Sequence, residues 1–542
     1  MVKNVELAQD QIFLTMRLRY FTLALFTFAL LSCQKEKDST PVNSTAPEAE
    51  LILINPVEPL NDRDPLSHPE LVQEFSSHLE RYGVVSWSNF NDYTVWSTAL
   101  SSDSVISVGY QPDGYGNLDQ SIHQIDIESP EWKNTKNSLI DYVVSETKRK
   151  YPTLSVETED LLVFGDKPLP YFNIRVWDYE ILANLRNFSV VRYAEPMGFT
   201  LENQGSYRSD SGCGGNSGIS NPSPNDFFTA PQGPRVSWNF IDMKIHKAWK
   251  SSSRGNGVTM GIIDTGISSD QAKLNSEFSG GLSGNRTVER YGFHDPCFLF
   301  IFCENDGIND LCGHGTNMAG TAVGPASSDG SFAGVAFQSN LIGIRAAEDV
   351  VHDTSAEQDG VSDAFTFLGN RADVDIISMS MGNLFSSGQI TDAINFAYNQ
   401  GKMIFTAAGT SFEFTSFVGV IFPATLNNTI AVTGTKTGLP MEKCTTCHSG
   451  SLVDFVVTME DRNNSDRRPL TLSDSGNDPN YTGGSSVATA TAAGIAALVW
   501  SNDLAQSRED VLEALKNASN FYPARNGDFG WGKINAQAAV LY

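Results

Sequence analysis

The sequence predicts two α/β domains, a small open-faced sandwich followed by a larger domain built on a parallel sheet. Three observations predict this arrangement. From residue 236 onward, near-continuous apolar runs alternate with amphipathic stretches, as in a parallel sheet covered by helices on both faces. Residues 121–199 have the order strand, helix, strand, strand, helix, strand. Residues 201–235 are rich in Gly, Ser, Asn and Pro and are expected to form the linker between the domains.

Length and charge narrow the possible functions. The chain has 542 residues, too many for one ordinary hydrophobic core, so two domains plus tails are expected. It carries 37 basic and 63 acidic residues, which gives a net charge of −26. This charge repels phosphate backbones and anionic membrane surfaces, and no basic patch reverses it. Nucleic acid is therefore not an expected partner.

The N-terminal segment has the layout of an export signal. Two arginines after Met16 precede an apolar run that ends in Leu-Leu-Ser-Cys33 and is too short to predict a membrane span. Because Ser precedes Cys33 and a polar stretch follows, residues 1–33 are expected to be a lipoprotein signal with Cys33 lipidated. An ordinary signal peptide with an incidental cysteine is the alternative. Residues 34–65, rich in Ser, Thr, Pro and Glu, then form a tether, and the protein is exported, either secreted or anchored to the cell envelope by lipid.

Periodicity assigns the elements of the N-terminal region, residues 66–200. Leu139, Val143 and Thr147 share one helical face, and Asp178 is expected to cap the N-terminus of a short helix. The expected helices cover residues 68–82, 137–150 and 178–187, and the expected strands cover residues 121–127, 169–177 and 188–196.

In the C-terminal region, residues 236–542, apolar runs predict the strands of the parallel sheet. The expected strands cover residues 258–264, 340–346, 373–381, 402–409, 429–435 and 452–457, with a helix over residues 390–400. Asp264 is the last residue of its strand. Functional sites of parallel sheets lie at the C-terminal ends of the strands, so Asp264 is a candidate site residue.

The Asp-Thr-Gly turn at 264–266 raises the alternative of an aspartic peptidase. That chemistry needs a second carboxylate close enough to share a proton. Asp-Ser-Gly also occurs at 210–212 and 474–476, but neither copy follows an apolar strand that would bury its turn. The expected fold is also not all-β, so the sequence argues against this alternative.

Two further stretches supply the partners of a serine nucleophile. His314 lies in CGHGTNMAGTAVG (312–324), and Ser486 lies in TGGSSVATATAAGIAALVW (482–500). Each begins a helix of small residues, and a Ser at a helix N-terminus has free N–H groups nearby that stabilise an oxyanion. Serine needs a base, and the base needs an orienting carboxylate. Ser486, His314 and Asp264 fill these three roles. Each alone has a structural explanation, such as a cap or a core histidine, but their combination points to catalysis.

The three blocks resemble the subtilase family of serine peptidases (peptidase S8). GIIDTGI, GHGTNMAG and GGSSVATATAAG are similar to its Asp, His and Ser blocks, and FGWGKINAQAAV is similar to its C-terminal motif. The resemblance covers about residues 236–542. It implies a subtilisin-like three-layer fold and a serine endopeptidase that acts through an acyl-enzyme on proteins or peptides. It also implies that residues 121–199 are a ferredoxin-like, inhibitor I9-like propeptide that inhibits its own peptidase domain, which would make the chain a zymogen.

The resemblance also assigns binding residues. The oxyanion is held by the Ser486 N–H and by Thr410, which stands where the family usually has Asn. Because losing one such donor costs on the order of 10²–10³ in turnover, a catalytically weak peptide-binding protein on the same scaffold is the alternative function. Ile421 is expected near the floor of the pocket for the P1 side chain. The expected substrate-binding backbone comprises Ser380, Met381, Gly382, Ala408 and Gly409.

Six cysteines besides Cys33 are consistent with export. Cys444 and Cys447 are close in sequence and are expected to form a disulfide. Together with His448 they also match the haem attachment pattern C-x-x-C-H, and they offer three zinc ligands, but their polar loop favours the disulfide. The remaining four permit three pairings that stay open: Cys213, Cys297, Cys303 and Cys312. We expect no required cofactor and no assigned metal site, although structural calcium is compatible with the family.

Overall fold

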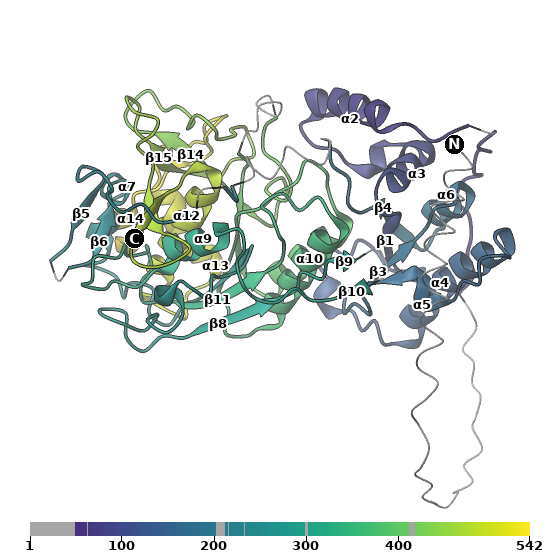
Figure 1. Ribbon diagram of the computed structural model, residues 1–542, viewed down its shortest axis with the longest axis horizontal. Helices are drawn as coiled ribbons and strands as arrows, with labels where there is room; N and C mark the ends of the chain where they lie inside the picture. The colour runs from purple at the N-terminus through teal and green to yellow at the C-terminus, as the bar shows by residue number, and fades with distance from the viewer. Residues whose placement is uncertain are drawn as a thin grey trace, which may run out of the picture. The chain divides into compact units, whose positions relative to one another are not determined.

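The structure is a computed structural model that describes residues 49–61, 63–201, 212–214, 216–231, 233–298, 302–410 and 418–542, with the backbone alone at 297–298 and 302–303 (Figure 1). These residues belong to one compact unit that begins at Pro47. The predicted signal, its Cys33 and residues 34–48 of the predicted tether lie outside the described residues. Within the described part of the chain, no helix is both long and apolar enough to cross a membrane.

The N-terminal region contains a four-stranded antiparallel sheet with the order β2-β3-β1-β4. The chain forms α2 (His68–Tyr82), η1 (Trp87–Asn89), α3 (Asp92–Ser101), β1 (Val105–Tyr110), η2 (Ile122–Gln124), α4 (Pro130–Lys150), α5 (Thr158–Leu161), β2 (Leu162–Val163), β3 (Tyr171–Arg175), α6 (Tyr179–Asn187) and β4 (Val191–Pro196). As predicted, Asp178 caps α6 by accepting a hydrogen bond from Ile181 N at 3.0 Å.

The first strand of this sheet is β1, and the predicted strand at 121–127 is wrong. Ile122–Gln124 forms a 3₁₀ turn, and of residues 121–127 only Ile122 is buried. All six residues of β1 are buried because it lies between β3 and β4, so it lacks the polar alternation of a half-exposed strand. The sandwich therefore begins before residue 121.

The second half of the predicted tether contacts this domain. Ile54 N donates a hydrogen bond to the Asn187 carbonyl at 2.8 Å, and Ser189 N donates to the Ile52 carbonyl at 2.9 Å. The apolar run at 51–54 has the β propensity that the surrounding Pro, Glu and Asn residues lack. The expectation of a free tether is therefore wrong for residues 51–54.

The C-terminal region is built on an eight-stranded sheet with the order β18-β15-β14-β13-β12-β7-β11-β8, and all neighbouring strands are parallel. Its strands are β7 (Thr259–Asp264), β8 (Val288–Gly292), β11 (Asn340–Arg345), β12 (Ile376–Met379), β13 (Met403–Ala407), β14 (Ile430–Lys436), β15 (Phe455–Glu460) and β18 (Gly532–Lys533). The predicted parallel α/β fold is confirmed.

Helices cover both faces of this sheet. Met260 and Ile262 of β7 share a buried cluster with Met318 of α9 and Ala493 of α12. Gly261 points to the opposite face, where an added Cβ would lie 2.5 Å from Leu368 Cδ1 of α10. The remaining elements are α7 (Asn239–Asp242), α8 (Ile245–Ala248), η4 (Ala272–Leu274), β9 (Cys297–Phe298), β10 (Phe302–Cys303), α9 (His314–Val323), α10 (Ser355–Asn370), α11 (Gly388–Asn399), β16 (Leu470–Leu472), β17 (Pro479–Tyr481), α12 (Gly484–Trp500), α13 (Arg508–Asn517) and α14 (Ala536–Leu541).

Buried ion pairs join the N-terminal domain to α10 and α11. Lys167 Nζ lies 2.7 Å from Asp359 Oδ2 and 2.9 Å from Asp363 Oδ2, and its side chain is only 3% exposed. Arg192 forms a two-pronged pair with Asp392, at 2.9 and 2.5 Å. Removing one partner of a buried pair leaves the other charge buried without a counter-charge, which is strongly destabilising. These contacts therefore fix how the two regions pack against each other.

The predicted linker is partly structured. Its residues 227–229 and 235 contribute to an antiparallel hairpin of β5 (Phe227–Thr229) and β6 (Arg235–Ser237). Further upstream, Ile219 N donates to the Pro479 carbonyl at 2.8 Å. The Gly- and Ser-rich composition predicts turns correctly but does not reveal that the segment is bound to the second domain.

Candidate active site

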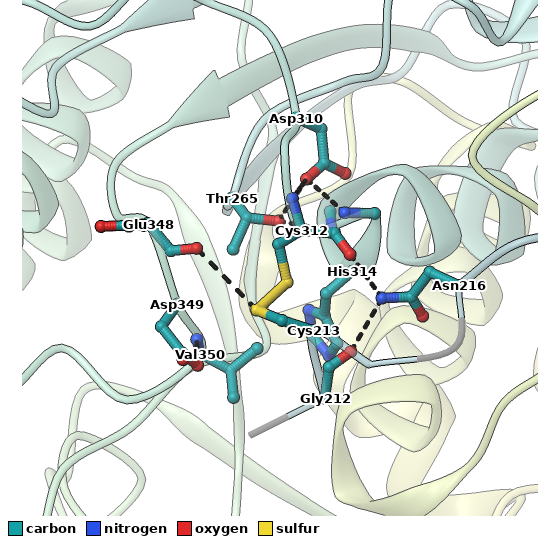
Figure 2. The surroundings of a disulfide bond; sticks show 12 residues. Gly212, Cys213, Asn216, Thr265, Asp310, Cys312, His314, Glu348, Asp349 and Val350 are labelled. Atoms are coloured by element: carbon teal, nitrogen blue, oxygen red, sulfur yellow. Dashed lines mark hydrogen bonds between the residues drawn. A yellow bond between two sulfur atoms is a disulfide. The ribbon is translucent and has the colours of Figure 1, made fainter. Parts of the chain in front are cut away.

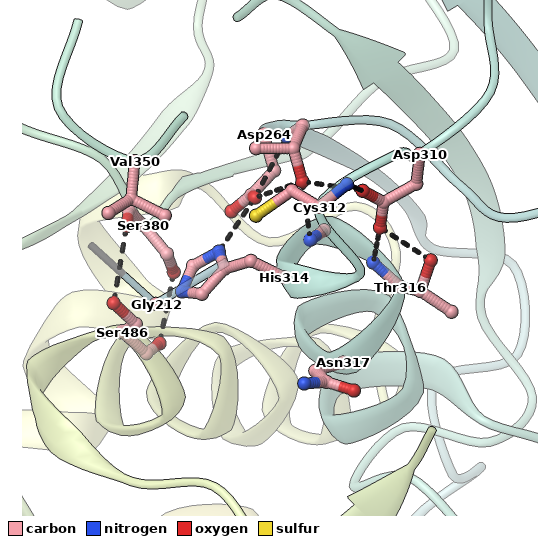
Figure 3. A network of polar contacts seen from close by, with 12 residues as sticks. Gly212, Asp264, Asp310, Cys312, His314, Thr316, Asn317, Val350, Ser380 and Ser486 are labelled. Atoms are coloured by element: carbon pink, nitrogen blue, oxygen red, sulfur yellow. Dashed lines mark hydrogen bonds and ion pairs between the residues drawn. The ribbon is translucent and has the colours of Figure 1, made fainter. Parts of the chain in front are cut away.

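The predicted acid and base meet at the C-terminal edge of the sheet. Asp264 ends β7, and His314 is the first residue of α9, whose N-cap Gly313 has φ 84°. His314 Nδ1 lies 2.7 Å from Asp264 Oδ1 (Figure 3). Both side chains are buried, with residue exposures of 1% for Asp264 and 6% for His314. The strand end and the helix start therefore bring together two residues 50 positions apart.

The environment of His314 stabilises its protonated form. Burial lowers the pKa of His314, but the charge and hydrogen bond of Asp264 and the charges of Asp310 and Asp349 outweigh burial, and the net pKa lies above the usual 6.5. An imidazole that gains stability on protonation suits a general base, because its cation forms during the reaction.

Ser486 lies beside the same imidazole, in the first turn of α12 (Figure 3). Its Oγ donates a hydrogen bond to the Ser380 carbonyl at 3.2 Å, and Ser380 Oγ donates to the Ser486 carbonyl at 3.0 Å. The hydroxyl of Ser486 is therefore turned toward the segment after β12 instead of toward His314. The structure brings Asp264, His314, Ser486 and Ser380 into one site.

Thr410 lies next to the nucleophile's helix. Its Oγ1 is 3.0 Å from Ser485 Oγ, and an added Cβ on Gly484 would lie 2.9 Å from the same Oγ1. The first backbone N–H groups of α12 have no partner within the helix, so they supply donors beside Ser486. The hydroxyl of Thr410 is thus near the expected oxyanion position, but it already shares a hydrogen bond with Ser485.

Several backbone groups of the expected substrate-binding segments already have partners. Gly382 N donates to the Val350 carbonyl at 3.1 Å. The carbonyl of Ala408 accepts from Ile421 N at 3.0 Å, and the carbonyl of Gly409 accepts from His448 N at 3.0 Å. Met381, which lies between Ser380 and Gly382, is 1% exposed. A substrate strand paired to Gly382 would have to displace its bond to Val350.

Ile421 fills space beside one of these segments. An added Cβ on Gly382 would lie 2.5 Å from Ile421 Cδ1. A cavity of about 40 Å³ lies here, and Ile421, Gly382, Thr410 and His448 line it together with residues 199–201 from the end of the N-terminal domain. The cavity is small, and the Ile421 side chain limits its size.

Asp310, which the sequence did not single out, organises the start of α9. Its Oδ1 accepts hydrogen bonds from Thr265 Oγ1 at 2.9 Å, Cys312 N at 3.0 Å and Gly313 N at 2.6 Å. Its Oδ2 accepts from Thr316 N at 2.9 Å and Thr316 Oγ1 at 2.6 Å. An acidic residue just before a helix N-terminus was the available signal.

A disulfide joins Cys444 to Cys447, with its sulfurs 1.96 Å apart. Both sulfurs are used in this bond, so neither is available for a thioether to haem or as a zinc thiolate. His448 packs against Gly409, where an added Cβ would lie 2.4 Å from His448 Nδ1. Burial lowers the pKa of His448 to about 4, so its ring is neutral. The C-x-x-C-H loop thus packs against residues 408–410, which include the expected substrate-binding residues Ala408 and Gly409.

A second disulfide lies beside His314 (Figure 2). Cys213 is bonded to Cys312, 99 positions away and two residues before His314. This resolves one of the pairings that the sequence left open. Only the backbone of Cys297 and Cys303 is described, and the two residues are paired opposite each other in β9 and β10.

Among the described residues, no group of three or more His, Cys, Asp or Glu side chains is arranged to hold a metal ion. Calcium binding, which the family resemblance allows, stays a prediction. Among the described residues, Asp264, His314 and Ser486 form the arrangement that can support catalysis.

Comparison with known proteins identifies the family. Residues 255–532, more than half of the chain, match the model of the subtilase family (Peptidase_S8). Thermitase of Thermoactinomyces vulgaris is 25% identical over 322 residues, which cover 59% of this chain and 99% of that protein. A thermophilic serine proteinase of Bacillus sp. (strain AK1) is 24% identical over 295 residues, 54% of this chain and 64% of that protein, so the chain spans less than two thirds of its length.

A solved structure supports the fold. Fervidolysin of Fervidobacterium pennivorans, described as a keratinolytic enzyme related to subtilisin, superposes with a TM-score of 0.54 at 14% identity over 81% of this chain and 61% of that chain. The match over residues 255–532, in which Asp264, His314 and Ser486 all lie, shows that the chain belongs to the subtilase family of serine peptidases.

Proposed function

We propose that this chain is an exported serine endopeptidase, made as a precursor, that hydrolyses peptide bonds in proteins or peptides through an acyl-enzyme. The observation that carries the proposal is the 2.7 Å contact between His314 Nδ1 and Asp264 Oδ1, with Ser486 beside the same ring. This contact supplies the pairing that a base and its orienting carboxylate require, and the Ser486 hydroxyl has only to turn from the Ser380 carbonyl to reach the ring.

In the proposed reaction, Ser486 Oγ turns from the Ser380 carbonyl toward His314 Nε2 and attacks the scissile carbonyl carbon. His314 takes the hydroxyl proton and then gives it to the leaving amine, while Asp264 holds the ring in its tautomer and stabilises its cation. The N–H of Ser486 and the hydroxyl of Thr410 stabilise the oxyanion. Water then attacks the acyl-enzyme with His314 again acting as base, and the mechanism requires no cofactor.

The N-terminal domain acts in this proposal as an inhibitory propeptide. Its last described residues, 199–201, line the same cavity as Thr410 and Ile421. The pairs of Lys167 and Arg192 with acidic residues of α10 and α11 fix the domain on the peptidase. Export and a lipid anchor at Cys33, which would place the enzyme at a membrane surface, follow from the N-terminal sequence, and two described disulfides suit an oxidising compartment.

A fluorophosphonate probe tests the peptidase directly. We expect the matured protein to be labelled at Ser486 and to cleave casein, and both properties to be lost in Ser486→Ala. Ser485→Ala is the matched control, because its hydroxyl is one residue away and outside the proposed proton path; it should still be labelled. A folded, matured protein that is not labelled would contradict the proposal.

A second candidate function is a catalytically weak peptide-binding protein, and the contact between Thr410 and Ser485 favours it. A hydroxyl that already shares a hydrogen bond is a poorer oxyanion donor than a free amide. If this limits turnover, Thr410→Asn should raise kcat by about tenfold or more, since one donor is worth on the order of 10²–10³. Peptide binding without turnover in both proteins would favour the binding function.

A further inference from the structure

Gly212 lies beside the imidazole of His314 (Figure 3) and is the first residue of a strap of the chain, defined here as residues 212–214 and 216–219. An added Cβ on Gly212, which has φ 90°, would lie 3.3 Å from His314 Cδ2 and 3.7 Å from Val350 Cγ1. Cδ2 is bonded to Nε2, the atom that must take the Ser486 proton. The strap therefore covers the edge of the ring at which the reaction takes place, in line with the 6% exposure of His314.

Asn216 fixes the strap on the peptidase domain. Its buried amide donates to the Gly212 carbonyl at 2.8 Å and to the Cys312 carbonyl at 2.6 Å (Figure 2). Its Oδ1 accepts from Asn317 Nδ2 at 2.7 Å, and its backbone carbonyl accepts from Asp474 N at 3.1 Å. These contacts hold Gly212 in place by hydrogen bonds alone, which local opening can break.

The disulfide between Cys213 and Cys312 makes the attachment covalent. A maturation cut before Gly212 leaves Gly212 and the rest of the strap bonded to the loop that precedes His314. A cut after Cys213 leaves the released N-terminal domain bonded to the same loop. Proteolysis at either place therefore does not by itself clear the space next to the imidazole.

We propose that the strap is an autoinhibitory segment and that opening the Cys213–Cys312 disulfide is a second activation step, after cleavage of the precursor. The proposal rests on the proposed peptidase function. A dithiol reductant would attack Cys213 Sγ to give a mixed disulfide and release the Cys312 thiolate. Its second thiol then displaces Cys213, so the reductant leaves oxidised and both cysteines leave as thiols. Cys213 is half-buried between exposed Gly212 and Gly214, which gives a reductant access.

The two states differ in competition for the cleft. In the oxidised state the disulfide fixes Cys213 on the loop before His314, so the strap competes with substrate at an effective concentration on the order of millimolar. In the reduced state the strap is joined to the domain only through its C-terminal end, so Gly212 is no longer held beside the imidazole. We therefore expect mild dithiothreitol to raise kcat/KM of the matured enzyme for peptides by about tenfold. Without reductant, Cys213→Ser should be as active as the reduced wild type, and dithiothreitol should not change its activity. That variant keeps Cys444 and Cys447, so it also controls for reduction of the second disulfide.

Both proteins are made from the full chain, matured, and assayed with a peptide substrate and a fluorophosphonate probe. Peptide mapping after alkylation identifies which disulfide has opened. If Cys213→Ser does not fold, wild type that is reduced, alkylated at Cys213 and still folded by circular dichroism replaces it. If oxidised wild type is labelled and turns over substrate as fast as Cys213→Ser, the autoinhibitory role of the strap is contradicted, while the proposed peptidase function still stands. Failure of every form to label would overturn both.

Discussion

Replacing Asp310 by asparagine would test whether the loop before α9 positions the catalytic histidine. The substitution keeps the size of the side chain and one carbonyl oxygen. The Asn oxygen can still accept from Thr265, Cys312 and Gly313, as Asp310 Oδ1 does. The amide NH₂ then stands where Oδ2 accepted two hydrogen bonds from Thr316, at 2.9 and 2.6 Å.

The structure sets the size of the effect. The Thr316 N–H would face another donor in a buried site, and a hydrogen bond to a charged group is worth about 1.5–3 kcal/mol. We therefore expect the free energy of unfolding to fall by about 2–3 kcal/mol. His314 precedes Thr316 by two residues, so the same change moves the imidazole relative to Asp264. A displacement of about 1 Å costs on the order of 10² in rate, and kcat should fall by that factor.

The assay separates positioning from stability. Urea unfolding is measured in a Ser486→Ala background to prevent self-digestion, and kcat and KM are measured with a peptide substrate in the active protein. Asp226→Asn is the matched control, because Asp226 is a buried carboxylate paired with Arg467 at 2.8 Å and lies outside the proposed site. It should lose stability while keeping kcat. A kcat for Asp310→Asn within about threefold of wild type, with the same loss of stability, would refute the positioning role.

Three further predictions concern pH and substrate size. Burial opposes protonation of His314, but its acidic neighbours raise its pKa above 6.5. We therefore expect kcat/KM to fall with decreasing pH at a midpoint above 6.5, and a midpoint below 6 in the pH–rate profile would contradict this. Burial raises the pKa of Glu195 to about 7 despite the hydrogen bond from Gly388 N. The folded state then holds the Glu195 proton more tightly than the unfolded chain, in which the pKa of Glu195 is about 4.5. The protonated carboxyl therefore contributes its full stabilisation below pH 4.5, and this stabilisation is lost as the pH rises through 7. Glu195→Gln should flatten that dependence, which amounts to at most about 3 kcal/mol, in urea unfolding across pH. Ile421→Gly should raise kcat/KM for Phe or Tyr at P1 relative to Ala by about tenfold, because it empties the space beside Gly382; an unchanged preference in a peptide series would mean that this side chain does not limit the pocket.

The sequence predicted the parts of the molecule that depend on local pattern. β7 ends at Asp264 and α9 begins at His314, because an apolar run and a Gly-flanked small-residue run each define their own element. Six strands of the sheet were predicted for the same reason, namely β7, β11, β12, β13, β14 and β15, whereas β8 and β18 were not. The small residues around Ser486 marked a helix packed closely on its neighbours, and α12 is buried along nearly its whole length.

Features that depend on distant partners could not be predicted. The bond between Cys213 and Cys312 spans 99 positions, and nothing in the polar linker indicates that Asn216 pairs with residues of the second domain. β1 was missed because a strand buried on both faces lacks alternation, whereas 121–127 has alternation without a neighbouring strand. The contacts of Asp310 also needed the fold, since its partners are Thr265, the residue after β7, and Thr316 of α9.

The contacts of Lys167 have a consequence for biosynthesis. Lys167 precedes its partners Asp359 and Asp363 by almost two hundred positions, and Ser486 comes later still. Chains are made from the N-terminus, and their domains fold in that order. The sheet that flanks Lys167 is therefore made before α10, and α10 before Ser486. A domain that folds in this order is already in place as a cover when the peptidase surface that it binds is made.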